Sequence, residues 1–291
     1  MDFQFDLQDS RRYERWRKEK LDNFPTQPDE LITVLENAPT ISAGERRSIQ
    51  RSIDRANFAI YQCRRPIDRA EVRIIARGFG LERLEFSSET DEDGVTALYN
   101  KTGDEKSIYV PYSNKPLRWH TDGYYNPENA RLRSFLLHCC SDADSGGENS
   151  LLDHEIAYIQ LRDLDPGHIV ALMAEDALTI PANTRSGDEL RAESKGPVFH
   201  IGDDQRLHMR FTDRKVFAGW KNDPELDHAR AALANILEAS QFVFHHKLEP
   251  NQGIICNNVL HRRSGYSDAG DQTRLMYRIR SMDNVSLGLT D

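Results

Sequence analysis

The sequence has few cysteines, no long apolar run and no stretch of concentrated positive charge. The four cysteines, Cys63, Cys139, Cys140 and Cys256, include no C-x-x-C spacing, so we expect reduced, mostly buried thiols and no zinc knuckle or redox dithiol. No stretch approaches the roughly 20 apolar residues of a membrane span, and residues 1 to 6 include acidic side chains and no apolar core of signal-peptide length. These absences predict a cytoplasmic protein without a membrane partner.

The charge balance is acidic, with a formal net charge of -9 over 291 residues. A nucleic-acid backbone or an anionic membrane surface is bound by a concentrated positive field, which this composition does not provide. We therefore expect no nucleic-acid partner and a small-molecule substrate. The oligomeric state is left open, with a homo-oligomer as one alternative.

The length suits one large β-rich catalytic domain, residues 1–291, because barrels and sandwiches of this size are common as single domains. Residues 1–80 are expected to be mainly helical and to pack on the barrel. Helix starts are indicated by Asp9 with Ser10, and capping boxes by Ser42 with Glu45 and by Asp68 with Glu71. Residues 57–63 alternate like a strand between two of these helices.

From about residue 95 to residue 291 the pattern changes to short strand-like runs broken by Gly, Asn, Asp and Pro. The runs are residues 107–111, 133–140, 198–202, 207–212, 242–248, 254–260 and 274–280. Such a series predicts a double-sheet barrel, interrupted by helices after Asp153 and from Asp223-Pro224. Residues 183–196, rich in charge and small side chains, are expected to form a mobile loop over a site.

A histidine and an aspartate stand two positions apart in residues 117–123, which read Leu-Arg-Trp-His-Thr-Asp-Gly. On a strand this spacing points His120 and Asp122 to the same face, where they can share one metal. Taken alone the pattern is equally typical of a solvated strand end, because His-x-Asp occurs by chance in many proteins.

A third candidate ligand, His261, directly follows an apolar strand. Two imidazoles and one carboxylate form a facial triad, which leaves three positions on iron(II) open for a bidentate oxo acid and dioxygen. Structural zinc sites use four protein ligands instead. The alternative interpretation of His261 is a barrel-end histidine bonded to a neighbouring loop.

Arginines recur in residues 273–280, where strand alternation predicts one packed face and one face that carries guanidinium groups. We expect Arg280 on the second face to be solvent-exposed. Arg274, thirteen positions after His261, is better interpreted as a fork that holds the distal carboxylate of a dicarboxylate bidentately.

Together these segments resemble one enzyme family, the taurine and dichlorophenoxyacetate dioxygenases, with γ-butyrobetaine hydroxylase and clavaminate synthase as more distant relatives. The resemblance covers roughly residues 105–282, and order and spacing of its segments all fit. The segments are residues 116–123, 137–139, 145–153, 260–262 and 274–278. The resemblance implies a mainly β fold with added helices and a double-stranded β-helix (jelly-roll, cupin-like) core.

The family further implies that His120, Asp122 and His261 hold Fe(II) and that Arg274 binds the far carboxylate of 2-oxoglutarate. The implied reaction is oxidative decarboxylation of 2-oxoglutarate by O2, giving succinate and CO2, coupled to hydroxylation of an unactivated C–H bond of a small polar molecule. The retained Asp122 argues against halogenation, because related halogenases lack the carboxylate so that chloride can bind iron.

Two further cofactor-binding residues follow from the resemblance. Asn149 stands where the family commonly has a threonine, and its amide can donate a hydrogen bond to the far carboxylate instead. Arg278 matches the second family arginine, which reaches either the nearer carboxylate or an anionic group on the substrate. Arg210 is expected to be a solvated surface residue, with an anion site as the alternative.

Five aromatic residues either line a pocket and cage an ammonium group or simply belong to the core. They are Tyr124, Tyr125, Phe211, Phe217 and Trp220. Alternatives to hydroxylation are a desaturase or cyclase of the same family, or a non-oxidative metal-dependent barrel protein. The substrate is expected to be an amino acid, betaine, sulfonate or other carboxylate, and the sequence does not choose among them.

Overall fold

The computed structural model describes residues 4–86, 91–101, 110–185, 188–214, 218–268 and 273–286. The chain forms two compact units, each assembled from segments that are not contiguous in sequence. The first unit consists of Met1–Phe24, Trp119–Arg131 and Leu152–Val243. The second unit consists of Pro25–Arg118, Leu132–Leu151 and Phe244–Asp291. The expectation of a single catalytic domain stays a prediction.

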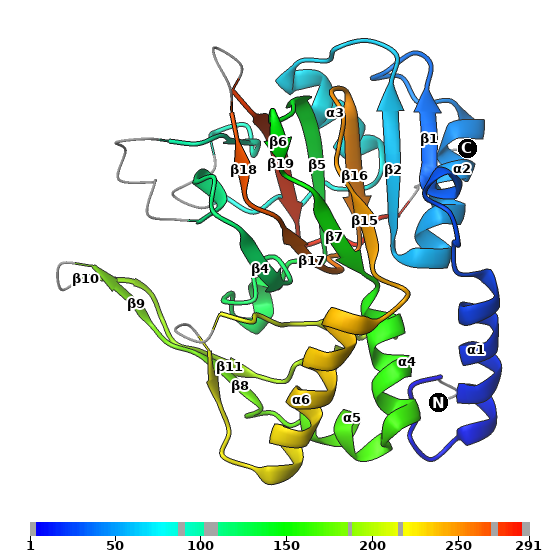
Figure 1. Cartoon of the computed structure of the whole chain (residues 1–291), viewed down its shortest axis with the longest axis vertical. Helices are drawn as coiled ribbons and strands as arrows, with labels where there is room; N and C mark the ends of the chain where they lie inside the picture. The colour runs from blue at the N-terminus through cyan, green and yellow to red at the C-terminus, as the bar shows by residue number, and fades with distance from the viewer. Residues whose placement is uncertain are drawn as a thin grey trace. The chain divides into compact units, whose positions relative to one another are not determined.

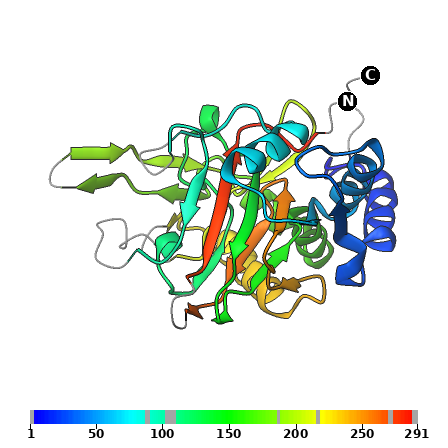
Figure 2. The same ribbon diagram turned by 90° about the horizontal axis from the view of Figure 1, so that it is seen from above.

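A six-stranded sheet dominates the second unit, and its strands lie side by side in Figures 1 and 2. Its order is β1 (Ile32–Leu35), β2 (Phe58–Cys63), β16 (Gln252–Cys256), β5 (Ser134–Ser141), β19 (Leu275–Ser281) and β3 (Thr96–Leu98). β1 and β2 run parallel, whereas every other neighbouring pair is antiparallel. Strands far apart in sequence are therefore neighbours in space.

A second sheet has the order β15 (Phe244–His246), β7 (Asn149–Leu152), β17 (Leu260–Arg263) and β4 (Leu117–His120). A short ribbon of β18 (Tyr266–Ser267) and β6 (Ser145–Gly146) continues beyond it. Ring contacts link the two sheets: the centroids of Phe135 and His261 are 4.7 Å apart, and those of Phe58 and Phe244 are 5.4 Å apart. Two sheets joined in this way form the barrel core that the strand pattern predicts.

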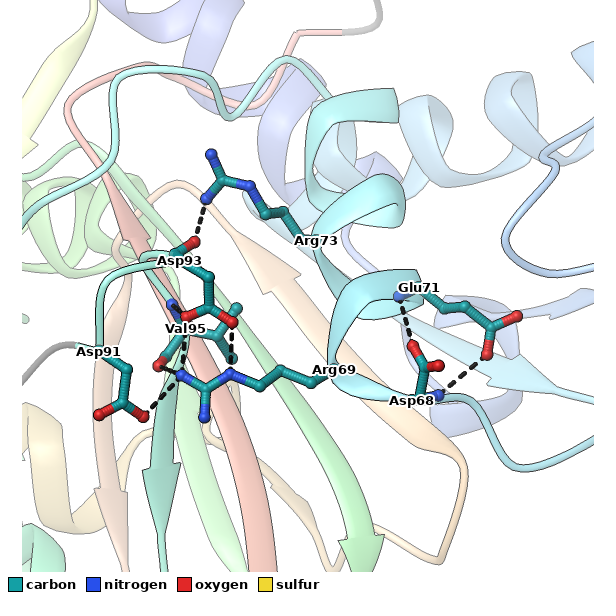
Figure 3. Close-up of polar contacts among 7 residues, drawn as sticks. All are labelled: Asp68, Arg69, Glu71, Arg73, Asp91, Asp93 and Val95. Atoms are coloured by element: carbon teal, nitrogen blue, oxygen red, sulfur yellow. Dashed lines mark hydrogen bonds and ion pairs between the residues drawn. The ribbon is translucent and has the colours of Figure 1, made fainter.

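Helices α2 (Ala43–Ala56) and α3 (Arg69–Gly78) cover one face of the six-stranded sheet. The core beneath them is a row of residues in register on four neighbouring strands, namely Ala59, Ile255, Leu136 and Ile279. Both predicted capping boxes are present, at Ser42 with Glu45 and at Asp68 with Glu71, and Figure 3 shows the second. Both helices therefore begin where the local sequence predicts.

The first turns of α3 also fasten the segment that leads into the edge strand β3 (Figure 3). Arg69 Nη2 donates to a carboxylate oxygen of Asp91 at 2.6 Å and of Asp93 at 2.7 Å, and it also contacts the Val95 carbonyl. Arg73 donates to the carbonyl oxygen of Asp93. These bonds tie the incoming chain to the helix, so that β3 can pair with β19.

The first unit is a helical layer with short strands. Its helices are α1 (Ser10–Asn23), α4 (His154–Leu164), α5 (Pro166–Leu172) and α6 (Pro224–Ala239), and α4, α5 and α6 pack against one another (Figure 1). Lys20 of α1 pairs with Asp153 at 2.7 Å and with Glu155 at 2.5 Å, at the start of α4. Asp153 and the Asp223-Pro224 pair begin α4 and α6, as the sequence predicts.

The remaining elements are short. In the first unit they are β8 (Leu178–Ile180), β9 (Asn183–Arg185), β10 (Asp188–Arg191), β11 (Ser194–Gly196), β12 (Phe199–Ile201), β13 (Leu207–Met209), β14 (Gly219–Trp220) and η4 (Glu128–Ala130). In the second unit they are the 3-10 turns η1 (Pro28–Leu31) and η3 (Val110–Tyr112). No helix in the described part of the chain is long and apolar enough to cross a membrane.

Three local predictions were wrong. Residues 183–196 were expected to be a loop, but they contribute β9, β10 and β11, because β9 pairs with β10 and β11 pairs with β8. The strand expected at 254–260 is two strands, β16 and β17, separated where Asn258 adopts a left-handed φ of 47°. Of the strand expected at 107–111, residues 110–111 lie in η3, and 107–109 lie outside the described residues.

Candidate active site

His120 ends β4, and Asp122 follows in the turn after it. Both are buried in the first unit, with 7% and 6% of their surface exposed, and His120 Nε2 lies 3.6 Å from Asp122 Oδ1. The spacing argument placed both on one strand, but the strand ends first because Gly123 turns the chain at a φ of 65°. The imidazole and the carboxylate are neighbours nonetheless, close enough for one ion to contact both.

Backbone bonds fix this turn against the segment that follows β13. Thr121 donates its N–H to the Phe211 carbonyl at 3.0 Å, and the Phe211 N–H returns a bond to Thr121 Oγ1 at 3.1 Å. The Asp213 N–H donates to the Trp119 carbonyl at 2.9 Å. The backbone that carries both candidate ligands is thus held on each side of His120.

Arg210 anchors the same turn from the interior of the first unit. Its guanidinium donates to the carbonyl oxygens of Tyr124 at 2.7 Å, Leu178 at 2.9 Å and Ser194 at 2.7 Å. Burial, with two nearby arginine charges, lowers the pKa of Arg210 to about 10. The expected surface position of Arg210 was wrong. Its buried guanidinium satisfies carbonyl groups from three separate segments of the chain, which would otherwise lack a hydrogen-bond donor.

The aromatic candidates differ in how near they are to the turn. Tyr124 lies edge-on to His120 with ring centroids 6.5 Å apart, and Tyr125 lies 5.2 Å from Tyr124. Phe211 is a buried core residue, and Phe217 lies outside the described residues. Tyr124 is therefore the aromatic side chain of this group that borders the candidate metal ligands.

His261 is the second residue of β17 in the second unit. Its Nδ1 lies 3.0 Å from the carbonyl oxygen of Val259. A carbonyl oxygen only accepts, so we assign the ring proton to Nδ1, and this tautomer carries its lone pair on Nε2. A metal-binding histidine commonly uses one ring nitrogen for the ion and the other for such a bond.

A pocket within the second unit is lined by both Arg274 and Asn149, together with Gly146-Gly147, Cys139 and Met276. Arg274 is 4% exposed, and among the described residues its Nη1 has no hydrogen-bond partner. No acidic side chain in the described part of the chain forms an ion pair with it. Burial lowers the pKa of Arg274, and the nearby Asp268 carboxylate, which accepts the Arg274 backbone N–H at 3.1 Å, offsets this only in part.

Arg278 and Arg280 lie on β19 and are both buried. Arg280 is 7% exposed and forms an ion pair with Glu85, whose N–H also donates to the Arg280 carbonyl at 2.9 Å. The expected solvent exposure of Arg280 was therefore wrong, because the segment before residue 86 returns to cover this strand. The role expected of Arg278 stays a prediction.

Lys247 is a pocket residue that the sequence reasoning missed. Its ammonium donates to the Ala143 carbonyl at 2.8 Å and pairs with Asp142 at 3.2 Å. The only sequence signal was a lysine at the end of an apolar strand, which is also the pattern of an ordinary surface residue. The pocket consequently contains two cations and one carboxylate.

Comparison with protein families decides the class. Residues 30–280 match the model described as "Taurine catabolism dioxygenase TauD, TfdA family". The chain belongs to this family.

Relatives of this TauD, TfdA family member carry a more specific name. A uridine-5'-phosphate dioxygenase from Amycolatopsis sp is 27% identical over 207 residues, covering 64% of this chain and 74% of that protein. A protein of the same name from Streptomyces sp is 26% identical over 221 residues, covering 72% and 77%. Among solved structures, the non-heme iron oxygenase OrfP in complex with Fe and alpha-ketoglutaric acid superposes with a TM-score of 0.63 at 16% identity, covering 83% of this chain and 80% of that one.

Family membership and shared fold confirm the class predicted from the sequence. The protein is a non-haem iron dioxygenase of the TauD, TfdA family, whose members use Fe(II), 2-oxoglutarate and O2. Its mainly β fold with added helices and a cupin-like core is confirmed as well.

Proposed function

We propose that this dioxygenase binds Fe(II) through His120, Asp122 and His261. His120 and Asp122 are adjacent buried donors, and His261 has the tautomer that leaves Nε2 for a metal. Two neutral imidazoles and one carboxylate suit Fe(II) and leave coordination positions for other ligands.

The oxo acid is proposed to bind with its far carboxylate on Arg274. Bound iron supplies the activation of O2, coupled to decarboxylation of 2-oxoglutarate to succinate and CO2. The observation that carries the proposal is the buried guanidinium without an acidic partner among the described residues, since a dicarboxylate supplies the missing counter-charge and a bidentate acceptor.

Asn149 and Arg278 are proposed to complete the binding of anionic groups. Asn149 lines the same pocket as Arg274, and among the described residues its Nδ2 makes only a long 3.5 Å bond to the His246 carbonyl, so its amide can turn to a bound carboxylate. Arg278 lies on the strand that directly follows Arg274 and binds either the nearer carboxylate or an anionic group of the substrate.

The reaction is proposed to be hydroxylation of an unactivated C–H bond in a small polar molecule. Uridine 5'-phosphate is the first compound to test, because both curated relatives are named for it. An amino acid, a betaine, a sulfonate and a second carboxylate complete the panel. Succinate formation that depends on one of these compounds identifies the substrate class.

The metal and oxo-acid proposals are tested with anaerobic protein. Fe(II) followed by 2-oxoglutarate should produce the weak visible charge-transfer band of the chelate. His120→Ala should lose the band because iron binds weakly, whereas Arg274→Lys should recover it at higher 2-oxoglutarate concentration. Absence of the band in the native protein at saturating iron and oxo acid would falsify the proposal.

A matched control is available on β19, the strand that directly follows Arg274. Arg280→Lys makes the same chemical change at another buried arginine, but Arg280 is paired with Glu85 and does not line the pocket. Arg274→Lys should raise the 2-oxoglutarate Kd by roughly tenfold or more, because a point charge replaces a bidentate fork. Arg280→Lys should leave this Kd within about twofold.

A further inference from the structure

The support of Arg274 within the second unit is an aromatic ring. The guanidinium carbon of Arg274 lies 5.0 Å from the centroid of Tyr266, which is 6% exposed. The same ring receives a second guanidinium, because the guanidinium carbon of Arg263 lies 4.8 Å from its centroid. Two buried arginines therefore share one tyrosine ring.

Arg263 is itself fixed by backbone acceptors. Its Nη2 donates to the carbonyl oxygens of Ser113 at 2.9 Å and Lys115 at 2.6 Å. Its charge is held near Arg274, and burial together with that neighbouring charge lowers the pKa of Arg263 to about 10. The region around Tyr266 is consequently electropositive beside the pocket that Arg274 lines.

Tyr266 is held tightly against the glycine turn of the pocket. It pairs in register with Gly146 on β6, and its N–H donates to the Asn114 carbonyl at 3.1 Å. Gly146 has a φ of 71°, and a Cβ there would lie 2.1 Å from the Gly265 carbonyl oxygen. A Cβ at Gly147 would lie 3.6 Å from Arg274 Nε and 3.7 Å from Tyr266 Cβ, so ring, guanidinium and turn form one packed group.

We infer that Tyr266 is a positioning residue, whose ring face holds the Arg274 guanidinium toward the oxo acid without neutralising its charge. A carboxylate in this place would compete with the distal carboxylate of the ligand. The negative face of an aromatic ring stabilises a buried cation and leaves its positive charge for an incoming anion. The Tyr266 hydroxyl makes no well-formed hydrogen bond among the described residues, although it lies near the Arg274 guanidinium, so the ring is assigned the main role and Tyr266→Phe separates the two contributions.

The inference rests on the proposed binding of 2-oxoglutarate by Arg274, and its test uses two oxo acids. Pyruvate has the keto acid group but no distal carboxylate, so only 2-oxoglutarate should depend on Arg274. The Kd of each is measured by calorimetry on anaerobic Fe(II) protein. Tyr266→Leu should weaken 2-oxoglutarate binding roughly 10- to 30-fold and Tyr266→Phe by no more than about threefold, with pyruvate little changed in both.

A second series keeps the shape of the ring and guards against a leucine variant that fails to fold. Tyr266→Phe is made with phenylalanine carrying one, two or three fluorine atoms, which weaken the negative ring face step by step. The 2-oxoglutarate Kd should rise with each fluorine, and the pyruvate Kd should stay constant.

Several results would overturn the inference. They are an unchanged 2-oxoglutarate Kd in the leucine variant or across the fluorinated series, an equal loss for pyruvate, and a loss in Tyr266→Phe as large as in Tyr266→Leu. If the native protein binds neither oxo acid, the proposed function fails and this inference fails with it. If the native protein binds 2-oxoglutarate and the variants do not discriminate, the inference alone is wrong.

Discussion

Acidification should destabilise the protein through one buried histidine, His138 on β5. His138 is 0% exposed, its ring stacks on Tyr61 with centroids 5.8 Å apart, and its Nδ1 lies 3.0 Å from the Tyr61 hydroxyl. Burial lowers the pKa of His138 from 6.5 to about 4. The folded state therefore keeps the ring neutral where the unfolded chain would protonate it.

The sign and size of the effect follow from this difference in pKa. Between pH 6.5 and about 4 the unfolded chain binds a proton at His138 that the folded protein does not bind. The free energy of unfolding should fall by about 1.4 kcal/mol for each pH unit in this window, to a total loss of about 3 kcal/mol. Above pH 6.5 the contribution is fully present, and below about pH 4 the loss from this residue stops growing.

The assay is urea unfolding at several pH values from 7.5 down to about 4.5, comparing the native protein with His138→Gln. Contributions of the acidic residues are common to both proteins and cancel in the difference. As the pH falls, the free energy of unfolding should fall more steeply in the native protein than in His138→Gln. The difference in slope should correspond to about one additional proton bound on unfolding. His228→Gln, at an exposed position of α6, is the matched control and should follow the native curve.

Parallel curves for the native protein and His138→Gln would refute the reasoning. Such a result would mean that His138 protonates in the folded state as readily as in the unfolded chain. His228 is exposed, so its replacement removes no buried imidazole. A curve for His228→Gln that departs from the native curve would therefore also contradict the reasoning.

Three further predictions concern stability and metal affinity. Gly253→Ala should destabilise the protein by about 1–3 kcal/mol in urea unfolding, because the new Cβ would lie 2.2 Å from the Tyr61 ring. Lys20→Met should cost about 3–5 kcal/mol in the same assay, since it deprives the buried Asp153 of its cation. Arg210→Met should cost about 2–4 kcal/mol by leaving buried carbonyls without a donor, and it should weaken Fe(II) binding in equilibrium dialysis because the turn after β4 loses its anchor.

Each of these has a contrary outcome. If the Gly253→Ala protein were as stable as the native protein, the Tyr61 ring would have to move aside at little cost. If Lys20→Met lowered the free energy of unfolding by less than about 1 kcal/mol, the Lys20–Asp153 ion pair would contribute no more than a solvent-exposed pair. Unchanged Fe(II) affinity in a destabilised Arg210→Met protein would confine this arginine to a purely structural role.

Helix starts could be predicted from the sequence because capping is local chemistry. The Ser42 and Asp68 side chains bond to backbone groups only three residues away, so the pattern contains both partners. The pairing of β9 with β10 and of β11 with β8 was not predicted, since residues rich in charge and small side chains give little strand signal. Their extended conformation depends on partner strands.

Exposure was harder to predict than secondary structure. Arg280 and Arg210 look alike in the sequence and were both expected at the surface, yet one pairs with Glu85 and the other donates to carbonyls from three segments. The partners are remote in the chain, so no local pattern reveals them. The motif residue His138 likewise turned out to stack in the sheet interior.

The sequence by itself determined the family, and it predicted the kinds of ligand atom and the arginine for an oxo acid, because these depend on residue types at set spacings. Only the tertiary structure decided what surrounds those residues: a buried Arg274 whose guanidinium forms no ion pair in the described part of the chain, a tyrosine ring shared with Arg263, and Lys247 in the same pocket. The reason is physical. Burial, charge compensation and ring contacts are properties of groups brought together from distant strands, and sequence spacing does not encode their distances.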